Sequence, residues 1–181
     1  MEEITVRPVH DHEWREVRAL RLRALQDEVA AIAFMDTFEV ASQRPDEFWQ
    51  QRTIGASIEA GENAHGRQFV AISADGTWIG SVTVLVERVG EKDFEGAEIQ
   101  RSAGAIVGVY LDPAYRGRGI IDTLFGSAVA WVRERELGFA RLYVHADNLR
   151  AQKAYERAGF HPTGKALQGS LGAELEMARE A

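Results

Sequence analysis

Residues 103–125, AGAIVGVYLDPAYRGRGIIDTLF, constrain the fold of this chain more than any other part of its sequence. Their apolar stretch at 105–111 is rich in β-branched and aromatic residues and is too short for a buried helix, so it predicts a strand. Asp112 and Pro113 end that strand, because proline cannot donate to a sheet ladder. The apolar residues that then recur at helical spacing are Ile121, Leu124, Phe125, Ala128 and Val132. They predict a helix that ends near residue 136.

An arginine- and glycine-rich loop, Arg116-Gly117-Arg118-Gly119, joins the predicted strand to the predicted helix. The two glycines leave room for a ligand to approach the backbone. At a helix N-terminus, unpaired N–H groups and the positive end of the helix dipole favour an anion, and two guanidiniums converge there as well, so the loop predicts a phosphate site. It is not a Walker loop, because no Gly-Lys-Ser/Thr follows. It also lacks the dinucleotide fingerprint, because Asp122 stands where the third glycine belongs. A simple tight turn is the alternative interpretation of such a loop taken alone.

The rest of the chain predicts strands and helices on both sides of this segment. The predicted strands are residues 4–9, 68–73, 78–86, 105–111, 141–145, 160–164 and 174–177. The predicted helices are residues 11–26, 46–60, 120–136 and 148–158. Asp11 is the expected N-cap of the first helix. No internal repeat or linker interrupts the order, which predicts one α/β (α+β) domain over residues 1–181.

The composition limits the partners of the chain. With 181 residues, 45% hydrophobic and 27% charged, it is long enough for one globular core. A net charge of −7 argues against nucleic acid, and the arginines of the loop suit a small anionic ligand instead. The absence of cysteine excludes disulfides, thiolate metal sites and a cysteine nucleophile. The sequence shows no signal peptide and no apolar run of the ~20 residues that a membrane helix needs, which predicts a soluble cytoplasmic protein without a membrane partner.

Two sets of side chains near the N-terminus have competing interpretations. His10 and His12 flank Asp11 like a metal pair, but without a third ligand they indicate a turn, so no metal is predicted. The first helix carries an arginine face made of Arg15, Arg18, Arg21 and Arg23. We interpret that face as solvated; the alternative is a wall for an acidic substrate.

Two motifs in the C-terminal half resemble the signatures of the GNAT N-acetyltransferases. Arg116 and Gly119 fit the acyl-CoA loop pattern Arg/Gln-x-x-Gly-x-Gly/Ala, from which Ile121 departs. The second signature is Asn-x-x-Ala-x-x-x-Tyr-x-x-x-Gly-Phe, and the residues that match it are Asn148, Ala151, Tyr155, Gly159 and Phe160. Asn148, Ala151 and Tyr155 share one helix face. The two motifs together are more specific than either alone.

The resemblance implies a central mixed, mostly antiparallel sheet of six to seven strands flanked by about four helices. It also implies acetyl-CoA as cosubstrate and no metal. N–H groups of the loop would hold the pyrophosphate, namely those of Arg116, Gly117, Arg118, Gly119, Ile120 and Ile121. The pantetheine arm would lie beside Val109, Tyr110 and Leu111, where N–H groups near Val109 and Leu111 would steady the oxyanion. Ala151 would contact the cofactor, and Asn148 would bind the pantetheine, cap its helix, or do both.

In the mechanism that the resemblance implies, a primary amine of a small molecule or peptide attacks the thioester directly. Tyr155 would protonate the departing thiolate as general acid. The general base is open between Tyr110, His145, Glu87 and a chain of water molecules. The acidic composition favours cationic acceptors such as polyamines, aminoglycosides or peptide N-termini. Similar proteins are often homodimers. A non-catalytic acyl-CoA-binding module is the first alternative function, and a nucleotide-dependent oxidoreductase is the second.

Overall fold

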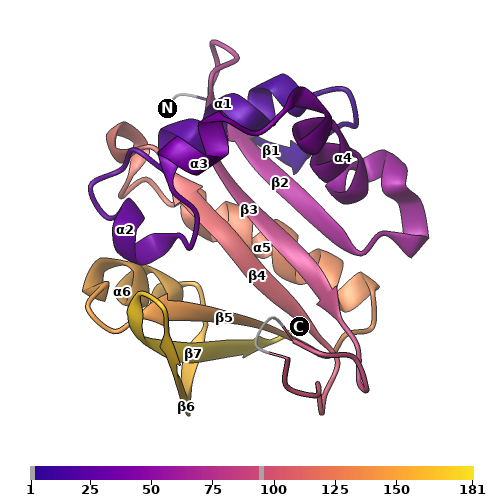
Figure 1. Ribbon diagram of the computed structural model, residues 1–181, viewed down its shortest axis with the longest axis vertical. Helices are drawn as coiled ribbons and strands as arrows, with labels where there is room; N and C mark the ends of the chain where they lie inside the picture. The colour runs from indigo at the N-terminus through magenta and orange to yellow at the C-terminus, as the bar shows by residue number, and fades with distance from the viewer. Residues whose placement is uncertain (1–2, 94–95) are drawn as a thin grey trace.

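The computed structural model describes residues 3–93 and 96–181, which fold around one seven-stranded sheet of order β1-β2-β3-β4-β5-β7-β6 (Figure 1). The strands are β1 (Thr5–Pro8), β2 (Gly66–Ile72), β3 (Trp78–Glu87), β4 (Ala103–Leu111), β5 (Phe139–His145), β6 (His161–Gly169) and β7 (Gly172–Glu180). All neighbours pair antiparallel except β4 and β5, which are parallel. The predicted mixed, mostly antiparallel sheet is therefore confirmed.

Four helices of two turns or more accompany the sheet, and all four were predicted: α1 (Trp14–Ala24), α4 (Asp46–Ala56), α5 (Ile120–Glu134) and α6 (Leu149–Arg157). Shorter helical segments are α2 (Ala30–Ala33), α3 (Phe38–Ser42) and the 3₁₀ helices η1 (Ile58–Asn63) and η2 (Pro113–Tyr115). Residues 27–44 lack a hydrophobic period, so α2 and α3 were not predicted.

Several boundaries differ from the prediction. The N-cap of α1 is Glu13 rather than Asp11, which lies in the preceding turn. The helix predicted over 46–60 ends at Ala56, and η1 follows it. The last two strands are longer than predicted, because β6 and β7 pair as a hairpin through most of the segment expected to connect them. The predicted domain also includes residues 1–2 and 94–95, which lie outside the described residues.

Helices cover both faces of the sheet (Figure 1). Helix α5 packs along β2, β3, β4 and β5 on one face, and its Leu124 and Phe125 are fully buried there. Helices α1 and α4 lie on the other face over β2 and β3, where Leu20 and Trp49 are buried. Strands covered on both faces can be largely apolar, which fits the apolar run of β4 and the mostly apolar β3. Within residues 3–93 and 96–181, no helix is long and apolar enough to cross a bilayer.

The parallel strands β4 and β5 separate soon after they meet. Their ladder is limited to Gly104 opposite Ala140 and Ala105 opposite Arg141. The rest of β4 has no strand partner on that side. Near its middle, Gly108 has a φ of 62°, and the register with β3 shifts at the same place, which marks a β-bulge. The fold thus leaves an opening beside the C-terminal half of β4.

Candidate active site

A cavity of about 240 Å³ occupies this opening, between the end of β4, the loop before α5, helix α6 and the connection from α1 to α2. The predicted site residues that line it are Val109, Tyr110, Leu111, Arg116, Gly117, Ile121, Asn148, Ala151 and Tyr155. Arg118, Gly119 and Ile120 are not part of the lining. The structure thus brings together residues of both sequence motifs with the end of the central strand.

The end of β4 turns a backbone N–H group toward the cavity. The N–H of Asp112 donates to the carbonyl of Ile79 on β3. Because successive residues of a strand point their N–H groups to opposite edges, that of Leu111 faces the edge left open by β5. Val109 follows the bulge at Gly108 and lines the cavity as well. An amide donor is therefore available where the cavity meets the sheet.

The loop before α5 has the backbone conformation that its glycines permit. Gly117 and Gly119 both have a φ of 76°, and a Cβ at either position would meet no other atom within 4 Å. Gly119 is the N-cap of α5, so the first N–H groups of the helix lack intrahelical acceptors. Within residues 3–93 and 96–181, the N–H groups of Gly117, Gly119, Ile120 and Ile121 donate no hydrogen bond. This arrangement suits an anion.

The isoleucine that departs from the loop pattern lies on the wall of the cavity. The helical period predicted that Ile121 would face the core, and Ile121 does pack against it while it also forms part of the cavity wall, so it is half-buried. Ile120, which was not part of the predicted apolar face, is the buried residue at the start of the helix.

The sequence suggested that both loop arginines converge on a phosphate position, and the structure does not place them so. The guanidinium of Arg116 forms an ion pair with Asp27, and its Nε donates to the carbonyl of Leu111 at 3.0 Å. Arg118 is exposed, and it donates to the carbonyl of Ala114 at 3.0 Å. Because the guanidinium of Arg116 pairs with the buried carboxylate of Asp27, it forms part of the cavity wall and does not extend over the loop amides.

Tyr155 lies on α6 and lines the cavity. Its ring packs edge-on against Phe125, with 5.4 Å between the centroids. Burial raises the pKa of Tyr155 to about 12, so the phenol keeps its proton at neutral pH. The hydroxyl makes no hydrogen bond with another described residue. It is thus a protonated donor without an internal acceptor.

Asn148 caps α6 and lines the cavity at the same time. Its Oδ1 accepts the N–H of Ala151 at 3.2 Å, and the residue is 7% exposed. The side-chain amide makes no other hydrogen bond within the described part of the chain. The two roles considered for Asn148 are therefore compatible, since the oxygen caps the helix while the NH₂ group stays available.

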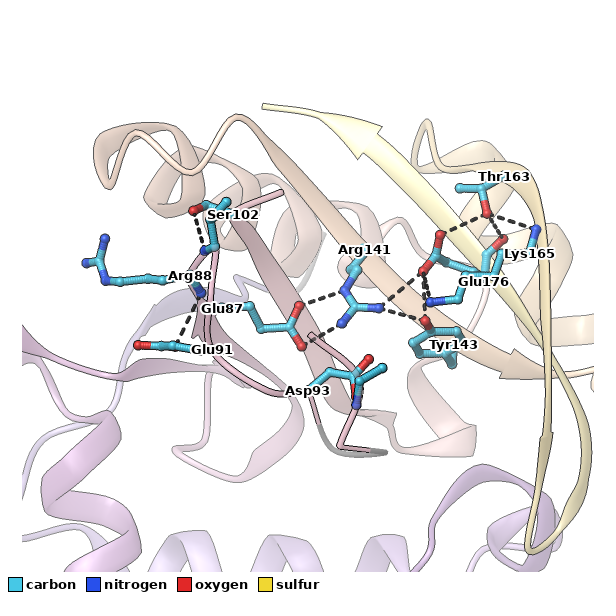
Figure 2. A network of polar contacts seen from close by, with 12 residues as sticks. Glu87, Arg88, Glu91, Asp93, Ser102, Arg141, Tyr143, Thr163, Lys165 and Glu176 are labelled. Atoms are coloured by element: carbon cyan, nitrogen blue, oxygen red, sulfur yellow. Dashed lines mark hydrogen bonds and ion pairs between the residues drawn. The ribbon is translucent and has the colours of Figure 1, made fainter. Parts of the chain in front are cut away.

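None of the three candidate bases is suited to accept a proton. Burial, and after it the charge of Asp112, raises the pKa of Tyr110, so its phenol stays protonated. The Nδ1 of His145 accepts the N–H of Asp147 at 3.1 Å, and its Nε2 lies 2.9 Å from the carbonyl of Leu171, which uses both ring nitrogens. Glu87 is held bidentately by Arg141 at 2.6 and 2.7 Å (Figure 2).

The Arg141 network explains why Glu87 is occupied. Figure 2 shows Arg141 between Glu87 on β3 and a second group formed by Tyr143 and Glu176. Its Nη1 donates to the hydroxyl of Tyr143 at 2.6 Å and to Glu176 at 3.1 Å. The carboxylate of Glu87 therefore neutralises a buried guanidinium.

Sequence reasoning missed several lining residues. Arg150, Ala154 and Arg157 lie on α6, and their i, i+4, i+7 spacing would have placed them on one face. The lining residues from the α1–α2 connection are Asp27 and Val29, and those from the end of α2 are Ala33 and Phe34. No sequence pattern indicated these four, because they come from the segment without a hydrophobic period.

His10 and His12 near the N-terminus each have a carboxylate neighbour, Glu59 and Asp11 respectively. The Nδ1 of His10 lies 2.7 Å from Oε1 of Glu59, and Asp11 lies in a turn as expected. Residues 3–93 and 96–181 contain no group of three histidine, aspartate or glutamate side chains arranged to hold a metal ion.

Comparison with known families gives one extended match. A family model described as the acetyltransferase (GNAT) family matches residues 17–160. Among curated proteins, the mycothiol acetyltransferase of Rhodococcus erythropolis is 42% identical over 57 residues, which are 32% of this chain and 19% of that protein. The chain thus spans about a fifth of the length of the mycothiol acetyltransferases that it matches.

Solved structures show the same fold at low sequence identity. An acetyltransferase of the GNAT family from Streptococcus pneumoniae superposes with a TM-score of 0.76 at 14% identity, covering 99% of this chain and 100% of that one. The PaiA N-acetyltransferase of Thermoplasma acidophilum in complex with coenzyme A superposes with a TM-score of 0.66 at 18% identity, covering 99% of each chain.

Proposed function

The chain belongs to the GNAT acetyltransferase family, and from this premise we propose that it is an acetyl-CoA-dependent N-acetyltransferase. In the reaction, the nitrogen of a primary amine attacks the thioester carbonyl carbon directly. A C–N bond forms, the C–S bond breaks, the nitrogen loses one proton, and the CoA thiolate gains one. No covalent enzyme intermediate is needed, and the sequence has no cysteine to form one.

The observation that carries the proposal is that backbone donors and the hydroxyl of Tyr155 meet in one cavity. The N–H of Leu111 at the open edge of β4, with that of Val109 after the bulge, can stabilise the oxyanion of the tetrahedral intermediate. The unpaired N–H groups of Gly117 and Ile121 in the lining, with those of Gly119 and Ile120 next to them, can bind the pyrophosphate of acetyl-CoA. The hydroxyl of Tyr155 lies in the same cavity.

The roles of Tyr155 and of the N-cap Asn148 follow from their environments. Tyr155 is protonated at neutral pH, so it can donate to the sulfur as negative charge develops there. Asn148 can donate its amide to the pantetheine arm while it caps α6. Arg157 adds positive charge for the remaining phosphates, whereas Arg150, which also lines the cavity, is paired with Glu28 at 3.2 Å. Because the candidate bases are occupied or protonated, we assign proton removal from the amine to water.

The test is the release of CoA thiol from acetyl-CoA in the presence of a panel of small and peptide amines, followed by mass spectrometry of the products. We expect amine-dependent thiol release and a mass increase of one acetyl group. Calorimetry with CoA tests the binding site separately. Binding of CoA without turnover on any amine would favour the non-catalytic module, whereas binding of NAD without CoA would favour the oxidoreductase.

The partners are proposed at the level of chemical class. The acceptor is a primary amine of a small molecule or a peptide. A homodimer and a cytoplasmic location remain predictions; size-exclusion chromatography with light scattering tests the first, and fractionation of the native cell tests the second.

A further inference from the structure

A second, smaller pocket of about 20 Å³ lies on the face of the sheet covered by α1 and α4. Its lining is formed by Val17, Arg21, Ala24, Arg52, Gln68, Ser81, Thr83, Gly108 and Tyr110. The floor is the β-bulge of β4, and the walls carry two guanidiniums, two hydroxyls and one amide. The polar part of the lining therefore consists of hydrogen-bond donors, two of which carry a positive charge.

The two arginines of this pocket have no anionic partner. Within residues 3–93 and 96–181, neither Arg21 nor Arg52 forms a hydrogen bond or an ion pair. The nearby Asp36 is paired with a third arginine, Arg44, at 3.0 Å. Burial, followed by the charge of Arg52, lowers the pKa of Arg21 to about 10, so Arg21 is still charged at neutral pH. The carboxylate of Asp36 is thus taken up by Arg44, and Arg21 and Arg52 have no ion-pair partner among the described residues.

This pocket adjoins the larger cavity, because Tyr110 lines both of them near the end of β4. The guanidinium of Arg21 lies over the ring of Phe34, 4.4 Å from its centroid, and Phe34 lines the larger cavity. A small charged group bound at the smaller pocket would therefore lie near the end of β4.

We propose that the acceptor amine also carries an anionic group, which Arg21 and Arg52 bind while the amine faces the open edge of β4. This inference rests on the proposed function and names its substrate class: small amines that bear a carboxylate or a phosphate-like group. Guanidiniums bind such groups through charge-assisted hydrogen bonds, and the neighbouring hydroxyls of Ser81 and Thr83 can complete the set. The acidic composition favoured a cationic acceptor, but the charges next to the reaction site decide recognition.

The first experiment compares matched amines in the acetyl-transfer assay. Straight-chain ω-amino carboxylates and α-amino acids are each measured against their primary amides, and ω-aminoalkylphosphonates of equal length form a third set. We expect kcat/KM for the anionic amines to exceed that of the amides by about 10–100-fold. The anionic group that gives the higher kcat/KM, carboxylate or phosphonate, identifies the anion that the site prefers. Equal values for acids and amides would overturn the inference and leave the proposed function intact.

The second experiment uses variants of the two arginines. Arg21→Gln and Arg52→Gln should remove most of the preference for the anionic amine by raising its KM, while KM for acetyl-CoA stays unchanged. Arg21→Lys should restore part of the preference. Arg15→Gln, on the exposed side of the same helix, is the control and should keep it. An unchanged preference in both Gln variants would contradict the assignment.

A third measurement needs no turnover. The anionic amines are titrated calorimetrically onto the complex with CoA, for the natural chain and for Arg52→Gln, whose side chain is exposed and should be tolerated by the fold. Binding that depends on Arg52 supports the anion site even if no amine is acetylated, in which case only the proposed function fails. Binding that is absent or independent of Arg52 overturns the anion site.

Discussion

The carboxylate of Asp27 is paired with the guanidinium of Arg116, although the two residues are 89 positions apart in the sequence. The side chain of Asp27 is 3% exposed and that of Arg116 is 25% exposed. Because Arg116 also donates to the carbonyl of Leu111, the pair joins the α1–α2 connection to the end of β4. One wall of the larger cavity therefore depends on a contact between the N-terminal half and the loop motif.

Replacing Asp27 should destabilise the protein. In Asp27→Asn, Arg116 keeps its charge but loses its partner, so we expect the free energy of unfolding to fall by about 3 kcal/mol. Urea denaturation measures this change. Arg101→Gln is the control, because its ion pair with Glu180 is exposed, and it should cost less than about 1 kcal/mol. Equal effects of the two substitutions would show that the Asp27–Arg116 pair contributes no more than a surface contact.

Tyr155→Phe should slow turnover and leave cofactor binding intact. Loss of a general acid lowers kcat by about 100-fold. Steady-state kinetics measures kcat, and calorimetry measures the dissociation constant of CoA. Tyr115→Phe is the control, because Tyr115 does not line the cavity. Full activity in Tyr155→Phe would remove Tyr155 from the acid role.

The pH dependence provides an independent check on Tyr155. Burial raises its pKa to about 12, so the phenol is protonated below that value and ionises only above it. We therefore expect no loss of kcat/KM from this group between neutral pH and pH values near its pKa. A fall of kcat/KM that begins near pH 8 in the natural chain and is absent in Tyr155→Phe would contradict this assignment.

Gly119→Ala should weaken cofactor binding without any steric clash. A φ of 76° is costly for alanine, by about 1–2 kcal/mol, so the loop should shift and displace its N–H groups. Calorimetry with CoA measures the loss of affinity. Gly126→Ala is the matched control on the exposed side of α5, where alanine should stabilise the helix by about 0.5–1 kcal/mol. Unchanged CoA affinity in Gly119→Ala would argue against a phosphate site in this loop.

Glu87→Gln should affect stability more than catalysis. The carboxylate neutralises Arg141, so its loss should lower the free energy of unfolding by about 1–3 kcal/mol. We expect the pH profile of kcat/KM to keep its shape, because Glu87 is occupied by Arg141. Loss of the acidic limb of that profile, with little change in the urea midpoint, would instead identify Glu87 as the base.

Much of the fold was predictable because local patterns decide it. The β-branched run before Asp112, the glycines of the loop and the apolar spacing of α5 each specify one element, and they agree with one another. The spacing placed Asn148 and Tyr155 on one side of α6, and the family resemblance placed that side near the loop. The sequence alone therefore determined the order of the strands and of the four longer helices, the family resemblance and most of the residues that line the cavity.

Only the tertiary structure decided the electrostatics of the site. Asp27 meets Arg116, Glu87 meets Arg141, and Arg21 lines one pocket with Arg52 through the packing of distant segments, which no local spacing encodes. Charge pairing depends on distance and burial in space, so the same arginine can be solvated, paired or left unpartnered in a pocket without any change in sequence pattern. For this reason the acidic composition pointed to a cationic acceptor, whereas the packing of α1 and α4 leaves two arginines facing the pocket.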